Sequence, residues 1–316
     1  FSYGSNTYPV GVEIAGARML LNQDGTVNLQ IGATEIGQGS DTVFAQMAAE
    51  TLGIPFGHIR VISTQDTDIT AYDPGAFASR QSYVAAPAVM QAASELRSKI
   101  LAHAELISHQ PQWGLTLLNG NVVMAAQPEM VLMSVAEVSM HAYYHQEIGA
   151  QLLAEISHKT TTNPPAFGCT FVDLSVDIPL CKVTINKIIN LHDSGRILNP
   201  QLAEGQVHGG MGMGIGWALF EEMIIDEKTG VVRNPNLLDY KFPTIMDLPD
   251  LECAFVETYE PQSAYGHKAL GEPPIISPAP AIRNAIRMAT GIPINTLPIT
   301  PKTLFAEFVQ AGLIRE

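Results

Sequence analysis

Six glycines lie within a single segment, from Gly205 to Gly216, and they constrain the fold more than any other feature of the chain. The segment follows Asn199-Pro200, a typical helix start, and its apolar residues continue to Phe220. Each glycine inside a helix costs about 1 kcal/mol relative to alanine. The sequence therefore predicts a helix to which either another helix or a ligand comes very close, and both alternatives stay open.

The first half of the chain alternates strand and helix patterns. In chain order these are a hairpin over 17–32, a helix over 40–52, a strand over 59–63 and a helix that begins close to Ser79 and Ser82. We expect Ser40 or Asp41 to cap the first helix and Gly53 to follow its end. From 108 to 165 the pattern is weaker.

Asn163-Pro164-Pro165 is the best internal boundary, because consecutive prolines interrupt regular structure. The second half then shows strand patterns over 171–176 and 182–189, the glycine-rich helix, a further strand pair with a turn at 226–230, and two final helices. The sequence predicts an α+β protein of two mixed α/β subdomains, 1–165 and 166–316.

Composition excludes several classes of function. The chain is 46% hydrophobic with a formal net charge of −14, which disfavours nucleic-acid binding. Its longest apolar run, 211–220, is too short to span a bilayer. The three cysteines show no Cys-x-x-Cys, so they predict neither a disulfide framework nor an iron–sulfur or zinc site, and they indicate a reducing, cytoplasmic setting. His141 and His145 have the spacing of a helical metal pair, but His-Glu-x-x-His is absent and no metal site is predicted.

Glu272 stands in a rigid turn before a helix. Gly271 precedes it and Pro273 and Pro274 follow, so the backbone is restricted on both sides. A desolvated carboxylate holds a proton more readily, which suits a general base, whereas a positive Lys268 would oppose that effect. A solvated glutamate in an ordinary turn is the alternative.

Two further junctions between a loop and a helix could bind an anion. In 32–41, Gly-Ala-Thr-Glu-Ile-Gly-Gln-Gly-Ser-Asp, glycines allow close approach, Gln38 presents an amide, and the helix start offers N–H groups. In 73–82, small residues, two hydroxyls and Arg80 precede a helix. A tight turn and a capped helix start, respectively, are the alternatives.

Together these segments resemble the molybdenum-binding subunit of the xanthine dehydrogenase and aldehyde oxidase family, with the closest likeness to bacterial xanthine dehydrogenases. The likeness covers nearly the whole chain. The matching segments, in family order, are 32–39, 75–82, 193–222, 239–249 (Asp-Tyr-Lys-Phe-Pro-Thr-Ile-Met-Asp-Leu-Pro) and 266–274.

The resemblance implies a role for individual positions. Glu272 matches the family's general base, which deprotonates a hydroxyl on molybdenum so that the oxygen attacks an electron-poor carbon while hydride moves to a sulfido ligand. The positions that the resemblance assigns to the cofactor and its surroundings are Gln38 and the adjoining Gly39, Ala78 beside the metal, Ser79, Arg80 and Gln81 along the pterin-phosphate loop, Gln206, and Lys268 before the catalytic turn. No residue of this chain is expected to ligate the metal directly.

The sequence departs from the family pattern in three respects. Met213 stands where relatives often have Gln, and Gly32-Ala33 replaces a common Gly-Gly. The family's upstream Phe-Gly-Gly and Phe-Arg-Gly segments are not in this sequence, which begins with Phe1, so we expect the chain to be the C-terminal portion of a longer subunit.

The resemblance implies a molybdenum hydroxylase that oxidises a purine such as xanthine or hypoxanthine with oxygen from water. It also implies a molybdenum–pterin cofactor, iron–sulfur clusters and FAD on partner domains or subunits, an upstream half that completes the pocket, and a complex that can dimerise. Neither nucleic acid nor membrane is an expected partner. Aldehydes or other N-heterocycles are alternative substrates, and a non-catalytic cofactor-domain or assembly protein is the alternative from another class.

Overall fold

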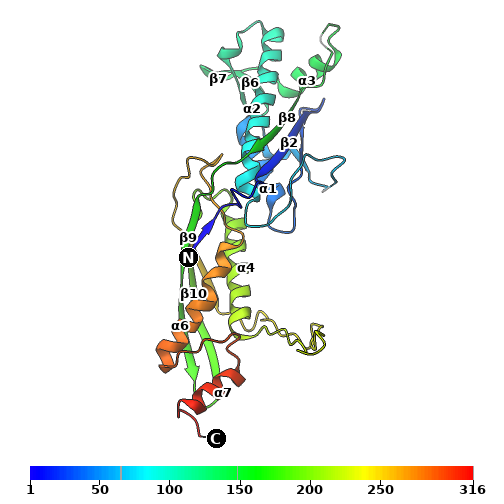
Figure 1. Cartoon of the computed structure of the whole chain (residues 1–316). Coiled ribbons are helices and arrows are strands. Elements are labelled where there is room, and N and C mark those ends of the chain that lie inside the picture. The colour runs from blue at the N-terminus through cyan, green and yellow to red at the C-terminus, as the bar shows by residue number, and fades with distance from the viewer. Residues whose placement is uncertain (65, 148, 316) are drawn as a thin grey trace. The chain divides into compact units, whose positions relative to one another are not determined.

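The computed structural model describes residues 1–64, 66–147 and 149–315, and the chain forms two compact units (Figure 1). The amino-terminal unit comprises Gly4–Pro164 and Tyr259–His267. The carboxyl-terminal unit comprises Phe1–Tyr3, Pro165–Thr258 and the chain from Lys268 onward. The assignment of 1–165 and 166–316 as two molybdopterin-binding subdomains stays a prediction.

A four-stranded sheet organises the amino-terminal unit. Its order is β4-β3-β2-β8, with bounds Ile59–Ile62, Val27–Ile31, Ile14–Leu21 and Leu153–Lys159. β2 and β3 are antiparallel neighbours, which confirms the predicted hairpin. β3 and β4 are parallel, so the chain must cross over between them, and it does so through α1 (Ser40–Leu52). The predicted helix is confirmed, but its N-cap is Gly39, because residue 39 adopts a left-handed conformation before the first turn.

α2 (Gln81–Ser108) packs against β2 and β8 of this sheet, as Figure 1 shows. Its small and β-branched residues from Val84 to Ala93 are almost all fully buried, so the helix can lie close to its neighbours. The weakly patterned region that follows contains α3 (Val135–Tyr144) and a three-stranded antiparallel sheet of β5 (Leu115–Leu118), β6 (Asn121–Met124) and β7 (Gln127–Ser134). Single 3-10 turns lie at Phe56–His58 and Gln112–Gly114.

A second four-stranded sheet organises the carboxyl-terminal unit. Its order is β1-β9-β10-β11, with bounds Ser2–Gly4, Pro165–Asp177, Lys182–Asp193 and Asp250–Phe255. β9 and β10 form a long antiparallel pair with a register shift between Ile185 and Lys187. β10 and β11 are parallel, and α4 (Pro200–Leu219) with the segment 221–249 makes the crossover between them.

α4 is the predicted glycine-rich helix. The Asn199 side chain caps it by accepting a hydrogen bond from Leu202 N at 3.1 Å, and Pro200 occupies its first turn. The strand pair expected after it is wrong: segment 221–249 contains a single isolated bridge between Ile225 and Val232 around the predicted turn. Its polar side chains bond to nearby backbone instead of continuing a ladder.

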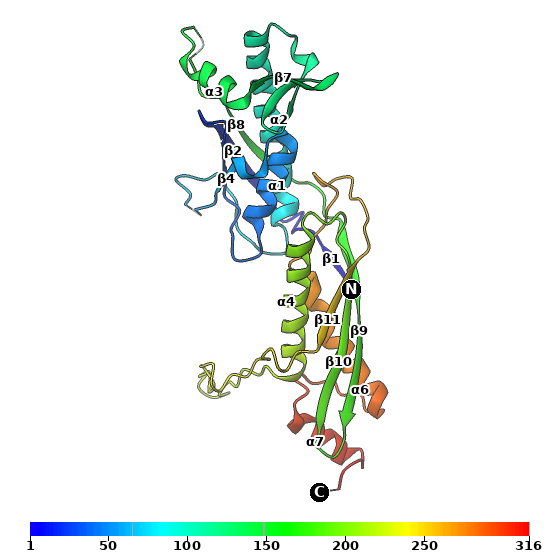
Figure 2. The same cartoon turned by 180° about the vertical axis from the view of Figure 1, so that it is seen from behind.

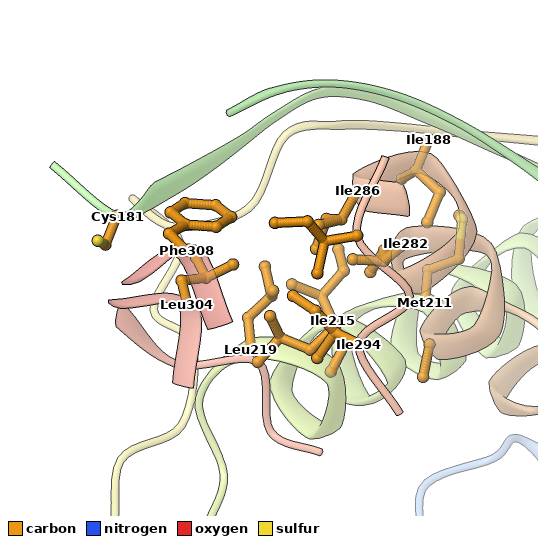
Figure 3. Packing of buried hydrophobic residues seen from close by; sticks show 14 of the residues in the cluster. Cys181, Ile188, Met211, Ile215, Leu219, Ile282, Ile286, Ile294, Leu304 and Phe308 are labelled. Carbon is orange, nitrogen blue, oxygen red and sulfur yellow. The ribbon is translucent and has the colours of Figure 1, made fainter. Parts of the chain in front are cut away.

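The core of the carboxyl-terminal unit lies between its sheet and four helices (Figures 2 and 3). After α4 these are α5 (Pro273–Ile276), α6 (Pro278–Thr290) and α7 (Pro301–Gln310). Figure 3 shows side chains of α4, α6 and α7 converging in this core, where Ile215, Ile282 and Phe308 are fully buried. Each contributes about 1.5–3 kcal/mol by leaving water, so the core holds α4, α6 and α7 together. α5 packs separately against α4, with Pro274 beside Gly210.

Across the described part of the chain, no helix combines the length and apolar character needed to cross a bilayer.

Candidate cofactor loops and catalytic turn

The start of α1 is occupied by a carboxylate of the same chain. Glu35 accepts hydrogen bonds from the backbone N–H groups of Gly37 at 2.7 Å, Gly39 at 3.1 Å and Asp41 at 3.1 Å. Burial alone would raise the pKa of Glu35, but these N–H donors outweigh it and hold the pKa below its ordinary value. The expectation that this helix start offers free N–H groups to a bound anion is therefore wrong, because Glu35 itself is that anion.

Gln38 and Gln81 join the two candidate loops of the amino-terminal unit. Gln38 Nε2 donates to Gln81 Oε1 at 2.6 Å and to the Thr34 carbonyl oxygen at 2.8 Å. Gln81 Nε2 donates to the same Thr34 oxygen at 3.0 Å. Two segments that are more than 40 residues apart thus share one polar cluster at the first turn of α2, where Thr34 and Gln38 contact Gln81.

Two adjacent residues in front of α2 have strained backbone. Ala78 and Ser79 have φ of 49° and 52°, in the left-handed region that residues with a side chain rarely occupy. Such strain costs on the order of 1–3 kcal/mol per residue and persists only where neighbouring contacts impose it. The next residue supplies these contacts.

Arg80 is fully buried and ion-paired. Its Nη1 lies 2.7 Å from Asp73 Oδ1, and both side chains are 0% exposed. It also donates to the carbonyl oxygens of Gly75 at 2.9 Å and Ile14 at 3.0 Å. The guanidinium therefore holds the loop 73–80 together through contacts on its buried side. Asp73 already balances its charge.

In the carboxyl-terminal unit, Glu272 immediately precedes α5 at the predicted rigid turn. A hydrogen bond from β10 holds this turn. Asn190 is fully buried and its Nδ2 donates to the Pro274 carbonyl oxygen at 3.1 Å. The Glu272 side chain is nevertheless exposed, so the expected desolvated environment is wrong within this chain. Tyr3 on β1 donates its hydroxyl hydrogen to Glu272 Oε2.

The four-residue spacing suggested that Lys268 acts on Glu272, but the ion-pair partner of Lys268 is Asp193. Its Nζ lies 2.8 Å from Asp193 Oδ2 at the end of β10, and its backbone N–H donates to the Ser194 carbonyl oxygen at 2.7 Å. Burial would raise the pKa of Asp193, but hydrogen bonds from Lys268 and Thr258 outweigh it and lower the pKa. Lys268 therefore fixes the path of the chain into the turn.

The predicted site residues fall into two groups. Gln38, Gly39 and 78–81 lie together in the amino-terminal unit, whereas Gln206 on α4, Lys268 and Glu272 belong to the carboxyl-terminal unit. Sequence reasoning missed Glu35 as an internal cap and Asp73 as the partner of Arg80. A carboxylate shortly before a helix start is a signal that could have identified Glu35, whereas no periodicity links Asp73 to Arg80.

His141 and His145, which the sequence singled out, have structural partners. His141 Nδ1 lies 2.9 Å from His103 Nε2, and the His141 and His145 rings are 4.9 Å apart. Among residues 1–64, 66–147 and 149–315, no three His, Cys, Asp or Glu side chains form a group suited to a metal ion. His267 is buried, with Nδ1 2.8 Å from Ser263 Oγ.

The chain thus combines mixed helices and sheets in both units. Residues 1–249 match the molybdopterin cofactor-binding domain, and the chain belongs to this family. The predicted family and fold class are confirmed.

Individual relatives agree with this assignment. The chain is 72% identical over 314 residues to the putative xanthine dehydrogenase molybdenum-binding subunit XdhA of Escherichia coli K12, a match that covers 99% of this chain and 42% of the relative. It is 32% identical to the nicotine 6-hydroxylase large subunit of Paenarthrobacter nicotinovorans, covering 90% of this chain and 36% of the relative. Reconstituted CO dehydrogenase from Oligotropha carboxidovorans has a similar structure, with a TM-score of 0.88 and 26% identity over 99% of this chain and 40% of that one. The chain thus spans less than half the length of these relatives.

The amino-terminal loops fit a molybdopterin cofactor in two respects. Gly37 has φ of +103°, and no atom lies within 4 Å of the position where a Cβ would stand, so the tip of its loop leaves room for a bound group. The imposed strain at Ala78 and Ser79 is typical of backbone held ready for a ligand.

Proposed function

We propose that this chain is the molybdenum-cofactor-binding part of a molybdenum hydroxylase that oxidatively hydroxylates a purine, xanthine or hypoxanthine, with oxygen derived from water. The observation that carries the proposal is the 72% identity with a putative xanthine dehydrogenase subunit across 99% of this chain. A substrate pocket depends on few side chains, so identity at this level supports a shared substrate class more strongly than identity near 30%.

Glu272 is the proposed general base. Its carboxylate takes up the proton that water loses as oxygen passes to the substrate carbon. The two prolines after it and the Asn190 bond to Pro274 hold the backbone of the turn, while the Tyr3 hydroxyl holds Oε2. A base fixed in this way loses little orientational freedom when substrate binds.

Each unit has its own proposed cofactor contacts. In the amino-terminal unit, Gln38, Ala78, Ser79 and Gln81 supply backbone and amide groups, Gly39 adjoins Gln38 in the same loop, and Ala78 leaves space for substrate. In the carboxyl-terminal unit, Gln206 in the first half of α4 supplies an amide. When bound, the molybdenum–pterin cofactor supplies the two-electron redox chemistry and the Lewis-acid activation of water.

Arg80 and Lys268 contribute in another way. Both side chains are buried and paired with carboxylates, so each holds its segment in place. We therefore assign them to positioning the loop 73–80 and the turn at Glu272, not to direct contact with the pterin.

The exposed position of Glu272 supports a larger assembly. A general base works best where water is excluded, so the remainder of the subunit is proposed to cover it and complete the pocket. We propose that iron–sulfur clusters and FAD lie on partner domains or subunits, since two clusters need more thiolates than Cys169, Cys181 and Cys253 can supply. A cytoplasmic enzyme is consistent with free thiols.

The test is metal and pterin analysis of the assembled enzyme, followed by turnover of xanthine and hypoxanthine in ¹⁸O-labelled water. Benzaldehyde and nicotine serve as comparison substrates. The proposal expects molybdenum, pterin and labelled purine product. Turnover of an aldehyde or nicotine in preference to purines would overturn the substrate, and an assembly without molybdenum would leave a cofactor-free scaffold.

A further inference from the structure

Four of the six glycines of α4 form two contrasting pairs, while Gly212 and Gly216 face residues of the segment 221–249. A Cβ at Gly210 would lie 2.4 Å from Pro274 Cβ, and one at Gly214 would lie 2.7 Å from Pro278 Cβ, so these two glycines let α5 and α6 pack closely. Gly205 and Gly209 have no atom within 4 Å of the same position. Close packing within the unit explains the glycines at 210 and 214. Gly205 and Gly209 each cost about 1 kcal/mol in helix propensity, and no close neighbour within this chain explains them.

Gly205 and Gly209 continue into an apolar stripe. Met213 and Trp217 follow at intervals of four residues, so all four lie on one face of the helix. Their side chains are 55% and 54% exposed, whereas Met211 and Ile215 on the opposite face are fully buried. This face is free of charged residues along these positions, and two glycines leave it flat enough for another backbone to approach.

The segment 221–249, here called the arm, extends this apolar surface. Polar contacts define its shape: Asn234 accepts from Ile224 N at 2.9 Å and donates to the Glu222 carbonyl oxygen at 2.7 Å, and Tyr240 donates to Glu221 at 2.7 Å. Figures 1 and 2 show the arm leaving the C-terminal end of α4 and projecting away from the sheet of its unit.

Apolar side chains of the arm point into solvent. Leu237 and Leu238 are each 78% exposed, Ile245 is 82% exposed and Met246 is 88% exposed. With five further large apolar residues of the arm and the two on α4, the summed exposed apolar area is on the order of 1,000 Å².

We propose that the outer face of α4 and the arm form the surface on which the remainder of the molybdenum-binding subunit docks. This inference rests on the proposed function and names the partner surface of that same chain. The 72% identical relative has more than half of its length outside the match, which is enough chain to cover the surface. The area and the scarcity of charge on α4 are typical of permanent contacts, which resemble a divided core, and not of transient contacts between subunits, which are smaller and more polar.

Hydrogen exchange tests the docking surface without cofactor or turnover. The 316-residue chain is compared with a single polypeptide in which it replaces the matched region of the 72% identical relative. We expect amide exchange in the arm to slow at least tenfold in the longer polypeptide, and α4 amides to follow. Met246→Asp should return the arm's exchange to the rate in the 316-residue chain, whereas Met288→Asp on α6, a methionine that is 89% exposed in the same unit, should not.

Gly209→Leu separates docking from folding. Because the space beside Gly209 is open, the 316-residue chain should keep or gain stability, yet the longer polypeptide should lose the protection of the arm. Equal protection in wild type, Met246→Asp and Gly209→Leu would overturn the proposal. So would a concentration-dependent dimer of the 316-residue chain that already protects the arm, since a second copy would then be the occupant. Missing molybdenum or purine turnover would count against the proposed function alone, because exchange does not depend on either.

Discussion

Asp73→Asn should destabilise the amino-terminal unit through one buried charge. The substitution keeps the shape of the side chain but removes the carboxylate that lies 2.7 Å from Arg80 Nη1, with both side chains 0% exposed. The carbonyl oxygens of Gly75 and Ile14 still accept from Arg80, but neither carries a compensating charge. Breaking a buried pair from one side costs about 3–5 kcal/mol, a large part of the 5–15 kcal/mol that a typical domain has.

Urea unfolding followed by circular dichroism measures this loss, with separate transitions fitted if the two units unfold separately. The double variant Asp73→Leu/Arg80→Met is the control, because removing both charges leaves none unpaired and should cost much less than Asp73→Asn alone. The reasoning is refuted if Asp73→Asn costs under about 1 kcal/mol, the range of solvent-exposed pairs. The pair would then be hydrated in solution and could not impose the strain at Ala78 and Ser79.

Three further predictions concern single sites. Gly210→Ala should lower stability by up to about 2 kcal/mol in thermal or urea unfolding, because overpacking against Pro274 exceeds the gain in helix propensity; a stabilised variant would contradict the packing in α4. Burial lowers the pKa of His267 from 6.5 to about 4, so the unfolded chain binds a proton at a higher pH than the folded chain does. The free energy of unfolding should therefore fall by up to about 3 kcal/mol as the pH drops from 6.5 toward 4. His267→Asn should flatten part of that slope, and an unchanged slope would refute the role of His267. Tyr3→Phe removes the donor to Glu272 and should reduce kcat of the assembled enzyme by roughly tenfold with KM little changed, whereas a raised KM at normal kcat would place Tyr3 in substrate binding instead.

Local signals in the sequence were sufficient for much of the fold. The Asp24-Gly25 turn, the Gly53 stop after α1 and the Asn199-Pro200 start of α4 each depend on chemistry within a few residues, and each element appears where predicted. The strand pair predicted within 221–249 was wrong, because the alternating apolar residues of this segment remain exposed in this chain instead of facing a core.

The candidate site was harder to predict where it depends on distant partners. Glu272, Gln38 and Gln81 were identified by family motifs, but the burial of Arg80 against Asp73 and the pairing of Lys268 with Asp193 required the tertiary structure. The same holds for the glycines of α4. Their spacing predicted close approach, and only the neighbours of each position distinguish Gly210, packed on Pro274, from Gly209, which faces open space.

Glu272 is the proposed base of a molybdenum hydroxylase. This role is tested most directly by the rate at which xanthine reduces the assembled enzyme in a single turnover, for wild type and Glu272→Gln at equal molybdenum and pterin content. We expect unchanged cofactor loading and a rate at least about a hundredfold lower in Glu272→Gln, the usual contribution of a general base. Equal rates in the two enzymes would contradict it.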